Sequence, residues 1–236
     1  MTKPKPESIE GRWDILYKDY PEVYDEFAQV QKTPPLNLAE KFHLAGKIIA
    51  DIGSGTGDSS FVYGKVAKEV IGIEIEPSML EVAEKRSKEE NIENVRFVLG
   101  EMEKIPLEDN TVDAVIGATL APPLPEQFRG FSAEAERITK SGGIIILLNI
   151  APGWNGGELH NIIEDYDDWG VKTDKVLVDC GFDYEDLYQD QEYGSIDKIV
   201  RTCGFIFGKK VIDYLKEHNK TNIKWKLRIR YKNIKK

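Results

Sequence analysis

A run of glycines after an apolar stretch constrains this chain more than any other feature of its sequence. Residues 48–61 read IIADIGSGTGDSSF: an apolar run, an aspartate, three glycines at alternate positions, and residues able to form a helix. A buried parallel strand that opens into such a turn brings bare backbone close to a ligand, because glycine adopts positive φ and has no Cβ. The N–H groups at the helix start can then hold polar ligand atoms. The sequence therefore predicts a ligand-binding loop, with a plain tight turn as the alternative.

A second apolar strand ends in an acid at a spacing typical of nucleotide sites. Residues 70–80 read VIGIEIEPSML, and Glu74 lies 21 residues after Gly53. In nucleotide-binding α/β units an acid at this distance accepts hydrogen bonds from the ribose hydroxyls. We therefore expect Glu74 to bind a ribose; a solvated charge at a strand end is the alternative interpretation.

The glycine spacing is G-x-G-x-G, whereas a dinucleotide fingerprint is G-x-G-x-x-G, so a nicotinamide dehydrogenase is disfavoured. A third strand at 95–99 is followed by Gly-Glu-Met, and a fourth strand at 112–118 begins Val-Asp-Ala-Val. With Ile-Pro at 105–106 and Asp-Asn at 109–110, this ordered set resembles the type-11 methyltransferase domain. That domain belongs to the class I S-adenosylmethionine (SAM)-dependent methyltransferases and is similar to ubiquinone/menaquinone-biosynthesis methyltransferases. The resemblance covers about residues 17–150.

The resemblance implies that the chain binds SAM and the product S-adenosylhomocysteine (SAH), and that a methyl group passes to its acceptor by in-line displacement. It implies that Glu101 and Met102 bind the adenine amino edge and ring. It implies no metal and does not assign a catalytic residue. The cofactor-binding residues expected on this basis are Asp51, Gly53, Ser54, Gly55, Gly57, Glu74, Ile75, Met79, Glu101, Met102 and Ala118.

The acceptor side departs from the family pattern. Val112 stands where the family has an aromatic residue, and Ala-Pro-Pro-Leu at 121–124 replaces a His pair. We expect acceptor contacts from the N-terminal segment and from residues 154–160, and the candidates are Tyr17, Tyr24, Trp154 and His160. His160 can serve as a base, because an imidazole side chain is a common general base; a surface or helix-cap role is the alternative.

The alternation of strands and helices predicts the fold class. Helices are expected at 78–90 and 126–139, followed by a Ser-Gly-Gly turn at 141–143 and a fifth strand at 144–150. Such alternation builds a parallel sheet with right-handed crossovers. The expected fold is therefore a Rossmann-like α/β fold of the class I methyltransferase type. It has a seven-stranded, mostly parallel sheet with one antiparallel strand and helices on both faces.

Beyond residue 150 the pattern predicts a helix at 158–169 with an acidic solvated face, a sixth strand after Phe182, a helix at 196–217 capped by Ser195, and a terminal strand. We expect a single domain in three parts. Residues 1–35 form an N-terminal lid, residues 36–150 the SAM-binding core, and residues 151–236 the acceptor-side elements and C-terminal strands.

The charge distribution bears on partners. The net charge is −9, yet residues 224–236 carry seven Lys and Arg and no acid, which leaves −16 on the remainder. An acidic body repels phosphate backbones and disfavours a nucleic-acid partner. The alternating KWKLRIRY at 224–231 predicts a strand with a solvated basic face; an acidic partner is the alternative.

The chain shows no export signal, no apolar run long enough to cross a membrane, and only two distant cysteines, so we expect a cytoplasmic protein away from membranes. The leading function is methyl transfer to a small-molecule acceptor. The alternatives are a nucleic-acid or protein methyltransferase, and a non-catalytic SAM-binding or partner-activating subunit. Pro122-Pro123 faintly resembles the Pro-Pro motif of amino-group DNA methyltransferases, but the polar residue before it and the aromatic residue after it are missing. The acceptor atom and the oligomeric state stay open.

Overall fold

The computed structural model describes Tyr20, Val23, Glu26, Phe27, Val30 and residues 34–163 and 169–236. These residues fall into two compact units. The large unit comprises residues 34–149, 171–186 and 228–236, and the small unit comprises the other described residues. The division of the chain into a lid, a core and acceptor-side elements stays a prediction.

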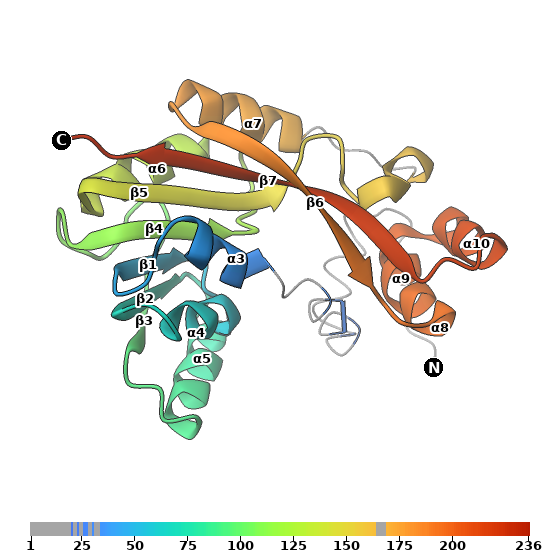
Figure 1. Cartoon of the computed structure of the whole chain (residues 1–236), viewed down its shortest axis with the longest axis horizontal. Helices are drawn as coiled ribbons and strands as arrows, with labels where there is room; N and C mark the ends of the chain where they lie inside the picture. The colour runs from blue at the N-terminus through green and yellow to red at the C-terminus, as the bar shows by residue number, and fades with distance from the viewer. Residues whose placement is uncertain (1–19, 21–22, 24–25, 28–29, 31–33, 164–168) are drawn as a thin grey trace. The chain divides into compact units, whose positions relative to one another are not determined.

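Seven strands form one sheet in the order β3-β2-β1-β4-β5-β7-β6 (Figure 1). The pairs β1·β2, β1·β4, β2·β3 and β4·β5 are parallel. Gly142 N donates to Ile234 O, and Ala151 N donates to Lys226 O. Residue numbers therefore rise along β5 while those of its partners fall, so β7 is antiparallel to β5. The strands are β1 (Ile48–Ile52), β2 (Glu69–Glu74), β3 (Val95–Leu99), β4 (Val112–Ala118), β5 (Thr139–Ile150), β6 (Asp183–Glu192) and β7 (Asn222–Asn233).

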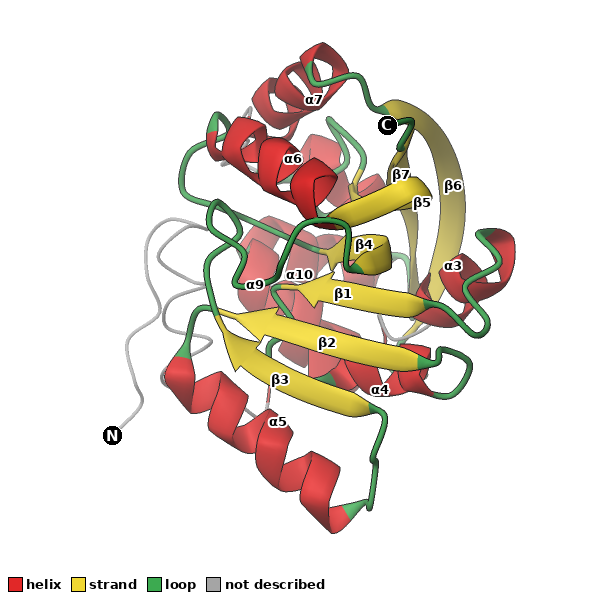
Figure 2. Ribbon diagram, turned by 90° about the vertical axis from the view of Figure 1, so that its left-hand side faces the viewer, coloured by secondary structure: helices red, strands yellow, loops and turns green. Residues whose placement is uncertain are grey.

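The crossover helices follow the expected hydrophobic spacing. In the helix after β4, Phe128, Phe131, Ala135 and Ile138 recur at intervals of three and four and are all fully buried. This helix and α7 lie beside each other near β5 (Figure 2), where Arg129 pairs with Asp179. The helices of the large unit are α3 (Pro34–Lys41), α4 (Asp58–Gly64), α5 (Pro77–Glu89), α6 (Gln127–Ile138) and α7 (Trp169–Asp179), whose first two residues lie in the small unit.

The expected turn at 141–143 is wrong, because β5 begins at Thr139 and not at Ile144. The helix ends where the Thr139 hydroxyl donates to Ala135 O, and Thr139 itself already pairs with Val112. The two glycines make an irregularity inside the strand: the β4·β5 register shifts between Val112 and Ala114, and Gly142 has φ +79°.

The expected helix at 158–169 is also wrong. Gly156 and Gly157 both have positive φ and open a short 3₁₀ helix, η1 (Gly157–Ile162), and Ile163 is extended. The Glu158 carboxylate accepts a hydrogen bond from Lys224 N. The acids of the expected solvated face, Glu164, Asp165, Asp167 and Asp168, lie outside the described residues.

The Ser195 cap is confirmed, because its hydroxyl accepts a hydrogen bond from Lys198 N. The single helix expected after it is broken into four parts, and Gly208 at φ +91° separates the last two. The parts are α8 (Ile196–Ile199), the π-helix η2 (Val200–Gly204), α9 (Phe205–Phe207) and α10 (Lys209–Glu217).

The apolar face expected for β7 is confirmed at Trp225, Leu227 and Ile229, which are buried, whereas Tyr231 of the same face is only half-buried. The prediction of a solvated basic face is wrong for Arg228 and Arg230. Arg230 is 2% exposed, and its Nη2 and Nε donate to Asp174 of α7. Arg228 donates to Asp174 and makes a bidentate pair with Asp186 of β6. The acidic partner of these two cations therefore lies within the chain itself.

Candidate functional site

The glycine loop after β1 has the backbone that its spacing predicts. Gly53, Gly55 and Gly57 all have positive φ, at +70°, +54° and +87°. Gly53 N and Ser54 N donate to Ile73 O at 2.8 and 3.1 Å, and Gly57 N donates to Ser54 O at 2.9 Å. The loop is thus fastened to the end of β2 and turns directly into α4.

Glu74, the last residue of β2, organises this loop with its side chain. It is only 8% exposed, so the solvated strand-end interpretation does not hold. Its Oε2 accepts a hydrogen bond from Gly55 N at 2.8 Å, and its Oε1 accepts from Ile75 N and Glu76 N at 2.9 Å each. A carboxylate has about four acceptor positions, so acceptor capacity remains on a group that already touches the loop.

Asp51, on β1 just before the loop, is fully buried. Burial raises the pKa of its carboxyl to about 7; the hydrogen bond from the Ser60 hydroxyl opposes this rise, and the charge of Glu74 adds to it. The Ser60 Oγ donates to Asp51 Oδ2 at 2.6 Å. Asp51 therefore ties β1 to α4 beneath the loop.

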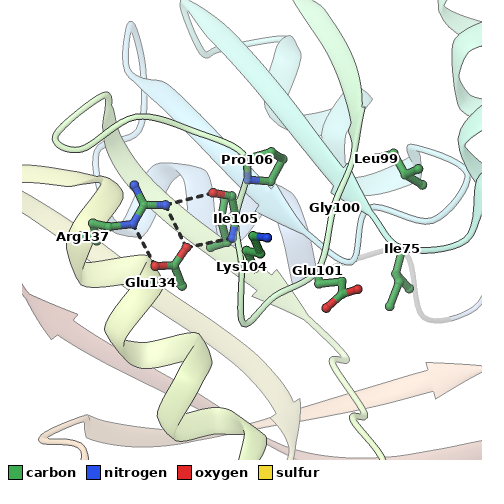
Figure 3. A pocket seen from close by; sticks show the side chains of 9 residues that line it. All are labelled: Ile75, Leu99, Gly100, Glu101, Lys104, Ile105, Pro106, Glu134 and Arg137. Carbon is green, nitrogen blue, oxygen red and sulfur yellow. Dashed lines mark hydrogen bonds and ion pairs between the residues drawn. The ribbon is translucent and has the colours of Figure 1, made fainter.

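A cavity of about 600 Å³ opens beside these elements within the large unit (Figure 3). Two predicted cofactor residues, Ile75 and Glu101, line it together with Leu99. Ile75 and Leu99 are 64% and 54% exposed, and together they give the cavity an apolar rim. The other lining residues are Gly100, Lys104, Ile105, Pro106, Glu134 and Arg137.

The other predicted cofactor residues do not line the cavity. Met79 is exposed in the first turn of α5, and Met102 is half-buried beside Glu101. Ser54 is buried in the loop, and its hydroxyl has no hydrogen-bond partner in the described structure. Ala118 is half-buried at the end of β4.

Sequence reasoning missed an ion pair on the cavity wall. The Arg137 guanidinium makes a bidentate pair with Glu134 one turn earlier on α6 and also donates to the carbonyls of Ile105 and Leu107 and to Asp109. Hydrogen bonds from Arg137 lower the pKa of Glu134, whose carboxylate also accepts from Ile105 N. The pair thereby fixes the 105–109 loop (Figure 3). The Glu-x-x-Arg spacing was the available signal.

On the acceptor side, Tyr17 and Tyr24 lie outside the described residues. The structure brings Trp154 and His160 together in the small unit, with ring centroids 5.3 Å apart, and Tyr188 meets Trp154 edge-on at 5.7 Å. The His160 Nδ1 lies 3.0 Å from Gly157 O. Among the residues that the structure describes, no group of three or more His, Cys, Asp or Glu side chains is placed to hold a metal ion.

Residues 43–196 match the model of a protein family described as a methyltransferase domain. The chain is 31% identical over 101 residues to the uncharacterized methyltransferase YcgJ of Bacillus subtilis. The aligned residues cover 43% of this chain and 40% of that protein. It is 30% identical over 108 residues to an arsenite methyltransferase of Halobacterium salinarum, covering 44% and 27%. It is 30% identical over 103 residues to a demethylmenaquinone methyltransferase of Tropheryma whipplei, covering 44% and 41%. The chain thus spans less than half the length of each of these relatives.

The crystal structure of the YcgJ protein resembles this chain with a TM-score of 0.60 at 17% identity, over 86% of this chain and 98% of that one. At such low identity the likeness shows the fold alone. It confirms the fold class expected from the motifs, a mostly parallel seven-stranded sheet with one antiparallel strand and covering helices.

Proposed function

We propose, from the fact that this chain belongs to the methyltransferase-domain family, that it transfers a methyl group from SAM to a small-molecule acceptor and releases SAH. Family membership confirms the resemblance drawn from the motifs. The observation that carries the proposal is the contact of the Glu74 carboxylate with Gly55 N, because it joins the ribose-binding acid to the glycine loop.

The described residues fit such a cofactor. Glu74 would accept hydrogen bonds from the ribose hydroxyls, and the backbone of Gly53–Gly57 would approach the amino-acid end without a Cβ in the way. The exposed apolar faces of Ile75 and Leu99 suit an adenine ring, and the Glu101 carboxylate suits its amino group. Asp51 would act indirectly, by holding β1 to α4.

When bound, SAM supplies an activated methyl group, because its sulfonium is a good leaving group. The chain's own part is to align the acceptor and exclude water. An acceptor lone pair forms the new bond to the methyl carbon, the electrons of the broken C–S bond stay on sulfur, and a proton released by the acceptor passes to a base or to water. We propose His160 as the candidate base, because a hydrogen bond from its Nδ1–H to Gly157 O, 3.0 Å away, would leave Nε2 to accept a proton.

Two of the similar proteins support a small-molecule acceptor by their names, which specify arsenite and demethylmenaquinone. The acidic charge outside the tail supports the same proposal against a nucleic-acid acceptor. None of the described helices is long and apolar enough to cross a membrane. A cytoplasmic location stays a prediction.

We also propose that the segment from Trp13 to Gln31 acts as a lid. The alternative is a helix packed permanently on the sheet edge. Of the described residues of this segment, Phe27 is buried edge-on against Trp225 at 6.5 Å, and Glu26 makes a bidentate pair with Arg201. Deletion of residues 1–31 tests this: a lid predicts a folded protein that binds SAM with little turnover. Global unfolding, or full activity, would contradict the lid.

Calorimetry with SAM, SAH and NAD tests the cofactor, and we expect SAM and SAH to bind and NAD not to bind. Incubation of the purified chain with a metabolite pool and methyl-labelled SAM then identifies the acceptor from the labelled product. Labelled DNA, RNA or protein in parallel arms would favour the alternative acceptors. SAM binding without any labelled product would favour the non-catalytic subunit.

A further inference from the structure

One residue just after β4 is held in an unfavourable backbone conformation. Thr119 has φ +57°, a left-handed value that β-branched residues rarely adopt. Its N–H donates to Leu148 O at 2.8 Å, and its hydroxyl donates to Ala118 O at 2.7 Å, so neighbouring groups hold it there. Strain of this kind persists where the surrounding structure requires it and concentrates at functional sites.

The turn at Thr119 places the next side chain over two glycines. Leu120 is 9% exposed. A Cβ built on Gly53 would lie 2.5 Å from Leu120 Cδ2, and a Cβ built on Gly117 would lie 2.5 Å from Leu120 Cδ1. Each methyl of Leu120 therefore occupies the space that a larger residue at one glycine would need.

The two glycines belong to different parts of the fold. Gly53 is the first residue of the loop after β1, and Gly117 is the last residue of β4 that pairs with β1. Gly53 has positive φ, which alone favours glycine, whereas Gly117 is not in the left-handed region. The space filled by Leu120, together with Leu147 Cδ2 at 2.8 Å, accounts for glycine at 117.

We propose that Leu120 is a positioning residue that fixes the glycine loop relative to the end of β4. It acts through the Gly53 backbone and does not itself touch the cofactor. The proposal deepens the proposed function and rests on it for its ligand, but the position of the loop can also be measured without a ligand. An ordinary core leucine in the same place would contribute to stability only.

Leu147 provides a matched control. It is fully buried on β5 and lies against the same Gly117, but no Leu147 atom lies within 4 Å of a Cβ built on Gly53. Leu120→Ala and Leu147→Ala should both lower the unfolding temperature, because each leaves a cavity. Only Leu120→Ala should loosen the loop. Leu120→Val offers a milder change if the alanine variant does not fold.

The first measurement is amide hydrogen exchange of the ligand-free protein. We expect faster exchange at residues 53–57 in Leu120→Ala than in Leu147→Ala. The second measurement is SAH binding by calorimetry. Leu120→Ala should weaken SAH binding by about tenfold, which is the scale of one lost hydrogen bond to a charged group. Leu147→Ala should weaken it by less than about twofold. Gly117→Ala should weaken it too, and less so when Leu120 is already alanine.

Equal loop exchange in the two leucine variants would overturn the inference, whatever the ligand result. Failure of the unaltered protein to bind SAH would instead contradict the proposed function and leave the exchange comparison to decide the role of Leu120. Additive effects of Gly117→Ala and Leu120→Ala would also count against it.

Discussion

The Nη1 of Arg86 donates a 3.0 Å hydrogen bond to the carbonyl oxygen of Thr56, the residue between Gly55 and Gly57. The same nitrogen reaches Asp58 Oδ1 at 2.9 Å, and the guanidinium carbon lies 5.0 Å from the centroid of the Phe61 ring. Helix α5 therefore holds the glycine loop through a side chain that comes thirty residues later in the sequence.

Replacing Arg86 by Met should leave the Thr56 carbonyl without this donor. Because the side chain is partly exposed, we expect a modest loss of SAH affinity, about threefold to tenfold. Calorimetry checks it, with Arg96→Met as the control. Arg96 makes an exposed pair with Glu69 at the start of β2, so its loss should not change SAH affinity. Equal effects of the two variants would show that α5 does not act on the loop.

Glu74→Ala should weaken SAH binding by about 2–3 kcal/mol, from the lost ribose bonds and the lost contact with Gly55 N. Glu74→Gln should have an SAH affinity between those of the wild type and Glu74→Ala, since an amide can keep one accepting oxygen. The neighbouring Glu76→Gln is the control, because Glu76 is exposed and caps α5 without touching the loop. Unchanged affinity in a folded Glu74→Ala protein would mean that the acid does not bind the ribose.

Asp51 predicts a pH dependence of stability. Its pKa is raised from 3.8 to about 7 in the folded protein, so between these values the folded state binds more protons than the unfolded state. The contribution of Asp51 is therefore fully present below about pH 4 and is lost as pH rises to about 7, by up to about 4 kcal/mol at 1.36 kcal/mol per pKa unit. Asp51→Asn should remove this component.

Denaturant unfolding from pH 4 to 8 measures the difference in free energy between the wild type and Asp51→Asn. Ser60→Ala gives a second check. The Ser60 hydrogen bond lowers the Asp51 pKa, so its loss should raise that pKa further and increase the loss of stability with rising pH. A difference that does not vary with pH would show that the pKa of Asp51 is not raised.

Asp174→Ala should destabilise the protein by about 3–5 kcal/mol, because it removes the ion-pair partner of the buried Arg230 and one of the two partners of the nearly buried Arg228. Asp183→Ala on β6 is the matched control, since Asp183 is exposed, and it should cost less than about 0.5 kcal/mol. Chemical denaturation gives both values. A small effect of Asp174→Ala would mean that the two cations are solvated after all.

Thr119→Gly should stabilise the protein by about 1 kcal/mol, because glycine adopts φ +57° without the clash of a branched side chain. Loss of the hydroxyl bond to Ala118 O and the greater freedom of the unfolded chain oppose this gain. The unfolding temperature measures the balance. A fall of several degrees would show that the hydroxyl, and not the backbone strain, dominates at this position.

The sequence predicted β4 to the residue and placed Glu74 at the end of β2, because both depend on local patterns of apolar residues and glycine. It did not predict the role of Arg137, since the 105–109 loop that this side chain holds lies about thirty residues earlier. Alternation placed Arg230 on a solvated face, but Asp174 lies there, brought from 56 residues away. Helical periodicity after residue 157 was overridden by two glycines with positive φ.

The packing of Leu120 against Gly53 and Gly117 links two neighbouring positions near the end of β4 to Gly53, which lies 64 residues before Gly117 in the sequence. We expect substitutions at 117 and 120 to be coupled, because a larger residue at 117 requires a smaller one at 120. An alignment of homologues should therefore show these columns covarying, with alanine or serine at 117 accompanied by a shorter side chain at 120. The same constraint would limit the order in which substitutions at the cofactor loop can accumulate.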